Sequence, residues 1–310
     1  MKILFAGTPD FAIAPLKSIL EHGYQVVGVV TQADKPQGRK GVLTPPPVKV
    51  FAIQQGLTVL QPTKIRDEIS ALKAFGADLM VTCAYGQILT QEVLDCFPKG
   101  VWNIHAGLLP KYRGASPIQS CILAGETQTG VCVMKTELGL DTGDILRESR
   151  TDILPTETCG ELSARLSQMG AELIADALKD IQTGEYRLQK QTGDAQTVRK
   201  IGKEQAKIDF AKPALQIVNL VRGMNPAPVA YAEIDGNKIN IYRAEIADFC
   251  GCESAKIGEI VCDIPKKGLI VKCGDGFVKL TEVQAAGGKI MRGSDFLNGR
   301  KVRAGQVFVC

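Results

Sequence analysis

The 310-residue sequence is poor in aromatic side chains and in histidine: it contains one tryptophan and two histidines. No apolar run approaches the roughly 18 residues that a membrane span needs. The apolar start, Met1–Gly7, is too short for a secretory signal and is typical of a first β-strand. We therefore expect no contact with a membrane and a location in the cytoplasm.

The cysteines and the first turn exclude two common kinds of site. Ten cysteines are present, but the only close pair, Cys250 and Cys252, has no histidine or second pair near it. This pattern predicts neither zinc nor disulfides, and it favours a reducing compartment. The turn after the first strand, Gly7–Asp10, lacks the G-x-G-x-x-G pattern of dinucleotide-binding proteins.

The net charge of +4 is unevenly distributed along the chain. Residues 1–206 hold 22 basic and 22 acidic side chains, whereas residues 207–310 hold 15 and 11. Such an excess can attract a polyanion such as nucleic acid, although composition alone favours a solvated surface rich in lysine, because a net charge this small is common. Five of the basic residues lie close together near the end: Lys289, Arg292, Arg300, Lys301 and Arg303.

The first part of the chain alternates short apolar runs with helical patterns. Repeated β-α-β units of this kind predict an α/β fold with a doubly wound, mostly parallel, Rossmann-like sheet over residues 1–185. Residues 186–207 are polar and without periodicity, which indicates a linker. Five short strand patterns follow within residues 208–310 and predict a small antiparallel β-barrel of the oligonucleotide-binding (OB) type.

Polar residues that could carry chemistry occur at one strand end. His22 ends a helical pattern and is typical of a surface position. Asn103 and His105, in contrast, alternate on the apolar strand 101–105, so both side chains point to the same face. At the carboxyl edge of a parallel sheet that face can border a ligand crevice; a buried pair that braces a loop is the alternative. The glycine-framed segment 139–144 adds an acidic residue, Asp141, or forms a plain turn.

These motifs together resemble those of the folate-dependent formyltransferase superfamily. The resemblance rests on Asn103-Ile104-His105, on Leu108-Leu109-Pro110 and on Gly139–Gly143. The opening residues 5–12, the loop 32–48 and the segment 203–209 are similar to those of the members that formylate methionyl-tRNA. The resemblance therefore implies formyl transfer from 10-formyltetrahydrofolate to the amine of methionyl initiator tRNA, by a monomer that needs no metal.

The resemblance also implies roles for individual residues. Asn103 would donate to the formyl oxygen, His105 would donate as well if protonated, and Asp141 would keep His105 charged and help to move a proton. The loops expected to bind folate comprise Gln87, Ile88, Leu89, Gly107, Leu108, Leu109 and Pro110. Members of the superfamily usually have serine where this chain has Gly107. The residues expected to contact tRNA are Lys35, Arg39 and Lys40, in the loop 32–47.

Three other functions are compatible with parts of this sequence. A formyltransferase acting on a nucleotide-linked amino sugar would share Asn103, His105 and Asp141, but the basic loop and the basic second domain favour a nucleic-acid substrate. An oxidoreductase or regulator with a Rossmann-type domain would be expected to carry the missing glycine motif. A non-catalytic RNA-binding protein would have no need for the three polar residues.

Overall fold

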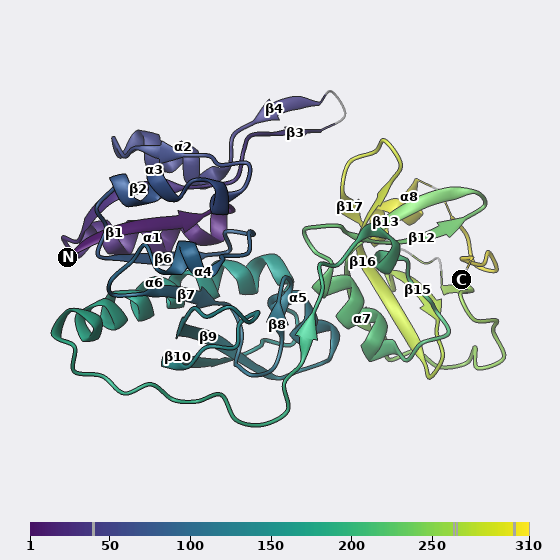
Figure 1. Cartoon of the computed structure of the whole chain (residues 1–310). Helices are drawn as coiled ribbons and strands as arrows, with labels where there is room; N and C mark the ends of the chain where they lie inside the picture. Colours follow the sequence, from purple (N-terminus) through teal and green to yellow (C-terminus); the bar gives the residue numbers. More distant parts are fainter. Residues whose placement is uncertain (39–40, 263, 265, 300–301, 310) are drawn as a thin grey trace. The chain divides into compact units, whose positions relative to one another are not determined.

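The computed structural model describes residues 1–38, 41–262, 264, 266–299 and 302–309 (Figure 1). The chain divides into two compact units. The first comprises Met1–Pro117, Gln128–Asp152 and Ser163–Arg199, and the second comprises Ile118–Thr127, Ile153–Leu162 and Lys200–Cys310.

The first unit is built on a seven-stranded sheet with the strand order β10-β9-β7-β6-β1-β2-β5. Five neighbouring strands, from β7 to β5, are parallel, and β9 and β10 add an antiparallel edge. The strands are β1 (Lys2–Gly7), β2 (Gln25–Val30), β5 (Val59–Leu60), β6 (Leu79–Cys83), β7 (Val101–His105), β9 (Gln128–Lys135) and β10 (Ile145–Asp152). The predicted doubly wound, mostly parallel sheet is therefore confirmed. The strand order reverses at β1, and sheets of this kind typically bind ligands at the carboxyl ends of the strands beside such a reversal, which here are β1, β6 and β7.

Helices cover both faces of this sheet (Figure 1). On one face, Leu72 and Val93 pack over Met80 and Val101 in a buried apolar cluster. On the other face, α6 approaches closely at Gly170, where an added Cβ would lie 3.1 Å from Ile104. The helices of the first unit are α1 (Ile13–Glu21), α2 (Pro47–Gln54), α3 (Ile69–Ala74), α4 (Gln91–Leu94) and most of α6 (Cys159–Thr183), with short 3₁₀ turns η1 (Asp10–Ala12) and η2 (Ile65–Asp67). Nearly all of α5 (Pro117–Leu123) belongs to the second unit.

Two small strand pairs lie outside the main sheet. The segment 32–47, which we expected to be a loop, contains a hairpin of β3 (Lys35–Gln37) and β4 (Val42–Thr44). Because this segment is rich in proline and glycine, strands of only three residues could not be recognised in its sequence. The second pair joins β8 (Arg113–Gly114) to β11 (Thr197–Val198) in parallel. This pair brings part of the predicted linker against the segment that follows the His105 strand.

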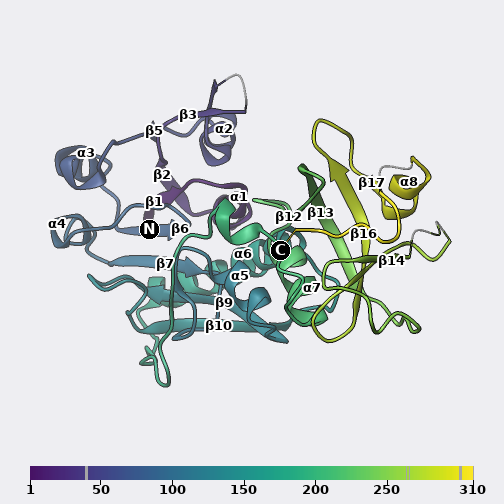
Figure 2. The same ribbon diagram turned by 90° about the vertical axis from the view of Figure 1, so that its right-hand side faces the viewer.

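The second unit contains a curled antiparallel sheet with the order β12-β13-β16-β15-β14, and β17 pairs with β16 (Figure 2). The strands are β12 (Ala230–Ile234), β13 (Asn237–Ile246), β14 (Ile260–Cys262), β15 (Leu269–Lys272), β16 (Phe277–Ala285) and β17 (Met291–Arg292). The helical elements are α7 (Ala214–Gly223), α8 (Gly293–Asn298) and the 3₁₀ turn η3 (Lys203–Ala206). Five of these strands occupy the positions that the sequence predicted.

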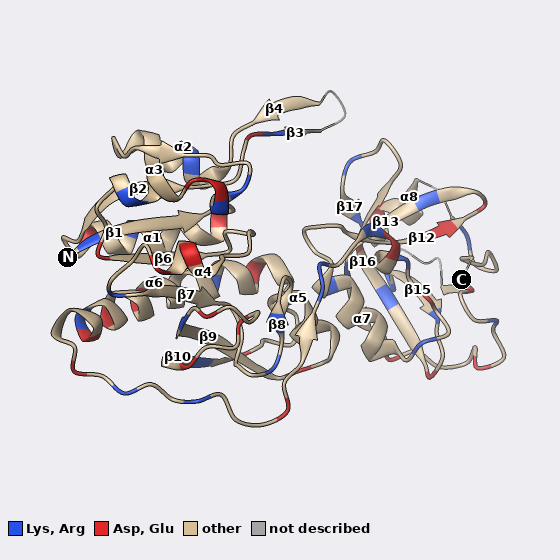
Figure 3. Ribbon diagram, in the orientation of Figure 1, with Lys and Arg blue, Asp and Glu red and all other residues tan. Residues whose placement is uncertain are grey.

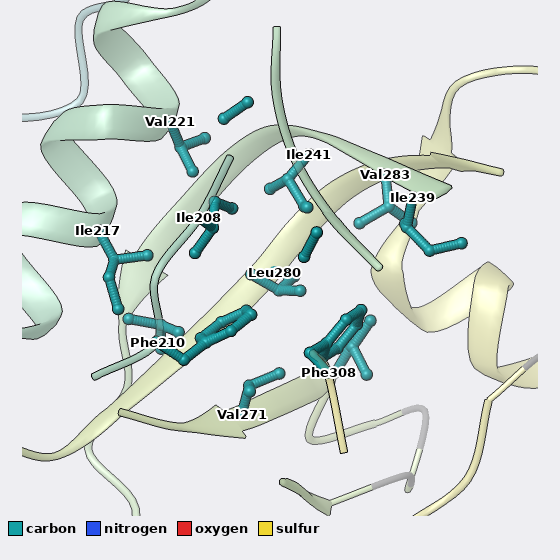
Figure 4. Packing of buried hydrophobic residues seen from close by; sticks show 14 of the residues in the cluster. Ile208, Phe210, Ile217, Val221, Ile239, Ile241, Val271, Leu280, Val283 and Phe308 are labelled. Atoms are coloured by element: carbon teal, nitrogen blue, oxygen red, sulfur yellow. The ribbon is translucent and has the colours of Figure 1, made fainter. Parts of the chain in front are cut away.

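The curl of this sheet encloses an apolar core (Figure 4). Phe210 and Phe308 are fully buried within it, with ring centroids 5.3 Å apart. The segment that carries Phe308 also links both edges of the sheet, since Val309 bridges Glu233 of β12 and Val307 bridges Glu259 next to β14. These bridges give the second unit the barrel-like form that the strand pattern predicted.

Basic residues of the second unit are interspersed with acidic ones along the ribbon (Figure 3). Of the five basic residues expected to cluster near the end, Lys289, Arg292 and Arg303 are exposed, whereas Arg300 and Lys301 lie outside the described residues. That these five residues are close in the sequence therefore does not by itself show that they form a basic patch.

Candidate active site

Strand β7 carries the first two polar residues of the candidate site. Val101 lies in the core under α3 and α4, so the alternation of side chains directs Asn103 and His105 toward the same face. Thr82 of the neighbouring strand β6 lies in register with Asn103, and its hydroxyl donates to Asn103 Oδ1 at 2.8 Å. This bond fixes the orientation of the amide and leaves its Nδ2 group free to donate elsewhere.

The loop between β9 and β10 supplies the third residue. Asp141 has a φ of +51°, a left-handed conformation that aspartate tolerates better than most residues. Gly143 of the same loop passes so close to the backbone of Lys135 that any Cβ there would clash with the carbonyl oxygen. The tight path of this loop turns the Asp141 carboxylate back toward the carboxyl end of β7.

The three side chains converge although they come from distant parts of the sequence. Asn103 Nδ2 donates to Asp141 Oδ1 at 3.4 Å, and His105 Nδ1 lies 3.5 Å from Asp141 Oδ2. The backbone N–H of Gly114 donates to the same Oδ2 at 2.7 Å. The His105 side chain is 4% exposed and that of Asp141 is 15% exposed. The set is therefore largely shielded from bulk water, which strengthens its electrostatic interactions.

The environment of the imidazole determines its charge. Burial lowers the pKa of His105, and the opposing effects of the Asp141 carboxylate and the Tyr112 carbonyl do not offset it. The ring is therefore neutral near pH 7. Because Tyr112 O can only accept, a neutral ring places its N–H on Nε2, which donates to Tyr112 O at 3.1 Å, and Nδ1 is then unprotonated and lies 3.5 Å from Asp141 Oδ2. The resemblance led us to expect that Asp141 keeps His105 protonated. The ring is neutral instead, because desolvation of the enclosed ring affects its pKa more than the nearby carboxylate does.

The lowered pKa of His105 predicts a pH dependence of stability. Below the unfolded-state pKa of about 6.5, the unfolded chain binds a proton that the folded chain does not, so stability falls as pH falls through this range. The contribution of one such group reaches at most about 1.4 kcal/mol per pH unit. With the free energy of unfolding measured in urea, we expect that of His105→Gln to fall less between pH 7 and pH 5 than that of the unaltered chain. His22→Gln, at an exposed position, is the matched control. If the free energy of unfolding changed equally with pH in His105→Gln and in the unaltered chain, the lowered pKa of His105 would be contradicted.

The residues expected to bind folate border the same edge of the sheet. The Gln87 side chain bonds to the backbone, accepting from Ile65 N at 2.8 Å and donating to Pro62 O at 3.2 Å. Leu89 and Leu109 are buried, whereas Ile88 is 82% exposed, which is unusual for isoleucine. These loops thus offer apolar surface and backbone groups to a ligand.

Gly107 lies directly beside the imidazole. A Cβ at this position would be 3.1 Å from His105 Nε2 and 3.3 Å from Pro117 Cβ. Both distances are shorter than an ordinary Cβ contact, so a serine here would fit only if the imidazole or Pro117 shifted. The rest of the loop is Leu108, Leu109 and Pro110, of which Leu108 and Pro110 are partly exposed.

Of the residues expected to contact tRNA, Lys35 lies within the described part of the chain. Lys35 is exposed on β3, where its Nζ donates to Gln32 Oε1 at 2.6 Å. Arg39 and Lys40 lie outside the described residues. On the other strand of the hairpin, Val42 and Leu43 are 61% and 64% exposed, so the hairpin presents apolar as well as basic side chains.

Sequence reasoning missed several residues that build this site. Thr82 could have been found from the strand order, because a polar residue at the end of a buried strand neighbours Asn103. Gln191 lies in the predicted linker, and its Nε2 donates to the carbonyl oxygens of Asp141 and Gly143, each at 2.8 Å. A single glutamine in a polar segment carries no signal of such a role.

Two features of other protein classes are absent from the residues that the structure describes. In the part of the chain that the structure describes, no three histidine, cysteine, aspartate or glutamate side chains gather into a set that could hold a metal ion. Over the same residues, no helix combines the length and the apolar character needed to cross a membrane.

Comparison with known proteins identifies the family. The Formyl transferase family matches residues 1–178, and the Formyl transferase C-terminal domain matches residues 200–301. The methionyl-tRNA formyltransferase of Neisseria meningitidis is 44% identical over 98% of this chain and 99% of its own length. That of Ruminiclostridium cellulolyticum is 40% identical over 99% of both chains.

A solved structure supports the fold assignment. The N-formyltransferase from Helicobacter canadensis, in complex with folinic acid and dTDP-3-aminofucose, superposes with a TM-score of 0.67 at 19% identity, covering 90% of this chain and 98% of that one. At this identity the likeness shows a shared fold alone. The near full-length matches at 40–44% identity are more specific, and they show that the chain belongs to the formyl transferase family and, within it, to the methionyl-tRNA formyltransferases.

Proposed function

We propose that this protein transfers a formyl group from 10-formyltetrahydrofolate to the free amine of methionyl initiator tRNA, giving formylmethionyl-tRNA for translation initiation. The observation that carries the proposal is the convergence of Asn103, His105 and Asp141 at the carboxyl edge of β7, in a chain of this family. An amide donor, a neutral imidazole and a carboxylate in contact can together assist the transfer of an acyl group to an amine, as oxyanion donor and general base.

The attacking group needs little activation. An α-amino group has a pKa of about 7.7–8, so a useful fraction is neutral near pH 7 and can attack the formyl carbon directly. No covalent intermediate on the enzyme is needed. Negative charge develops on the formyl oxygen and positive charge on the attacking nitrogen, and both must be stabilised.

Each of the three residues helps to stabilise one of these charges or to move the proton. Asn103 Nδ2, oriented by Thr82, donates to the formyl oxygen. The free Nδ1 of His105 accepts the proton that the amine releases, since the ring is neutral. The Asp141 carboxylate, 3.5 Å away, stabilises the imidazolium formed in that step. Return of the proton to the departing folate nitrogen restores the neutral ring.

The two loops beside the site suit the folate co-substrate. Ile88 offers exposed apolar surface, and the Gln87 side chain is occupied by backbone partners, so a ligand would bond to the loop through main-chain groups. Gly107 packs closely against His105 without a side chain of its own, so this part of the loop would also meet a ligand through main-chain groups. We assign folate binding to Gln87, Ile88, Leu89, Gly107, Leu108, Leu109 and Pro110.

We assign the formyl transfer to residues 1–185 and tRNA binding to residues 208–310, joined by residues 186–207. The basic excess of the last third supports an attraction to tRNA. Lys35, Arg39 and Lys40 would contact the acceptor end through its phosphates and unpaired bases. The protein would act as a monomer in the cytoplasm.

Formyl transfer to initiator tRNA in a purified system tests this function. With 10-formyltetrahydrofolate as donor, we expect methionyl initiator tRNA to be formylated and charged elongator tRNA to be a much poorer substrate. Binding of the tRNA should weaken steeply with salt, with a slope of about −2 in a log–log plot for three phosphate contacts. Formylation of a nucleotide-linked amino sugar instead, with no transfer to tRNA, would refute the proposal.

A further inference from the structure

Outside the three proposed catalytic residues, the side chain of Gln191 makes four hydrogen bonds beside the site. Its Nε2 donates to the carbonyl oxygens of Asp141 and Gly143, each at 2.8 Å. Its Oε1 accepts from Arg113 at both Nε, 3.0 Å away, and Nη2, 2.6 Å away. An amide has two N–H donors and two acceptor sites, so all four are used.

These four bonds join two loops that end at the same carboxylate. On one side Gln191 holds the backbone of Asp141 itself. On the other side it holds Arg113, whose neighbour Gly114 donates its N–H to Asp141 Oδ2 at 2.7 Å. The Asp141 carboxylate is thus fixed through its own main chain and through Gly114, and Gln191 connects the two supports.

The segment around Gln191 is itself anchored by its backbone. Gln189 exchanges two backbone bonds with Ile145, each at 2.8 Å, and β11 pairs with β8. The side chain of Gln191 therefore comes from a fixed position. Moreover, the left-handed conformation of Asp141 is strained for a residue with a side chain, and such conformations persist only where surrounding contacts hold them.

From these contacts we infer that Gln191 is a positioning residue for formyl transfer, which holds the Asp141 carboxylate at the distance from Asn103 and His105 that catalysis requires. The inference rests on the proposed function. Gln191 does not touch the reacting atoms and acts through Asp141. Displacement of a catalytic group by about 1 Å can cost on the order of 10²-fold in rate, so loss of these bonds should be visible in kcat.

Two substitutions at Gln191 and one nearby control test this inference. Gln191→Met keeps the length and loses all four bonds. Gln191→Glu keeps the acceptors for Arg113 but turns carboxylate oxygens toward two carbonyls. We expect each to lower kcat by about 10- to 100-fold, with KM for both substrates changed less than about threefold. The exposed Gln189→Met, whose residue bonds through its backbone, should stay within about twofold of the unaltered enzyme.

A double substitution separates positioning from a general structural effect. If Gln191 acts through the carboxylate, Gln191→Met should change kcat less than about twofold in an Asp141→Asn background. A kcat near that of the unaltered enzyme for both Gln191 variants, or an equal further loss in the Asp141→Asn background, would overturn the inference. The unaltered enzyme is assayed first: if it does not formylate methionyl initiator tRNA, the proposed function fails, independently of Gln191.

Discussion

Asn103→Ala is expected to lower kcat for formyl transfer by about 10²–10³-fold, the usual cost of removing one donor to a developing oxyanion. The amide is already oriented for this task, since Thr82 occupies its oxygen and leaves Nδ2 as the donor. Because the charge on the formyl oxygen grows in the transition state, the loss should appear in kcat more than in KM. Single-turnover rates with saturating tRNA and donor measure it without interference from product release.

The other two members of the set provide an internal comparison. His105→Ala and Asp141→Ala should also reduce kcat strongly, and the losses should be far from additive because the residues act together. Asn240→Ala, on β13 of the second unit, removes another part-exposed asparagine that bonds to Gln284 and serves as the control. Rates within a few-fold of the unaltered enzyme for all three site variants, with folding intact, would exclude this mechanism.

Phe210→Ala is expected to destabilise the second unit by about 3–5 kcal/mol, the range found for the loss of a buried aromatic ring. The ring is fully buried, and it stacks against Phe308, whose segment joins the two edges of the curled sheet (Figure 4). Its removal leaves a cavity and weakens the packing that keeps that segment in place. Hydrogen exchange of amides in β13 and β16 follows this unit without assuming that the whole chain unfolds in one step.

Phe249→Ala is the matched control for this effect. Phe249 is only partly buried and makes an edge-on contact with Phe277, with ring centroids 5.4 Å apart, in a smaller apolar cluster. We expect a loss of about 1 kcal/mol there, in keeping with the value of one aromatic pair. Equal losses for the two substitutions would mean that the core around Phe210 does not carry the stability of this unit.

The fold was predictable because its strands and turns produce local patterns in the sequence. The Val-rich runs of the first unit and the Asp235-Gly236 turn of the second are local signals, and both led to the strands that the structure contains. Asn103 and His105 could be placed on one face from their spacing alone. Their proximity to Asp141 could be expected only from the resemblance to known formyltransferases, because 35 or more residues of chain intervene.

Other features of the site depend on contacts that no local pattern reveals. The charge state of His105 follows from the burial of the ring, which depends on how several loops pack over it. The link from Gln191 to Asp141 crosses 50 residues and begins in a segment that composition marks as a linker. The backbone N–H of Gly114 is a partner that side-chain motifs cannot indicate at all.

The positive φ of Asp141 limits which amino acids can replace it over evolutionary time. Asparagine and glycine adopt this backbone geometry at little cost, whereas valine, isoleucine and most bulky residues do not. We expect that a saturation library at position 141, sorted first for folding and then for activity, retains only a few amino acids after the folding step. Since asparagine preserves the shape of the loop while abolishing the negative charge, this position allows electrostatics and architecture to be examined separately within one enzyme.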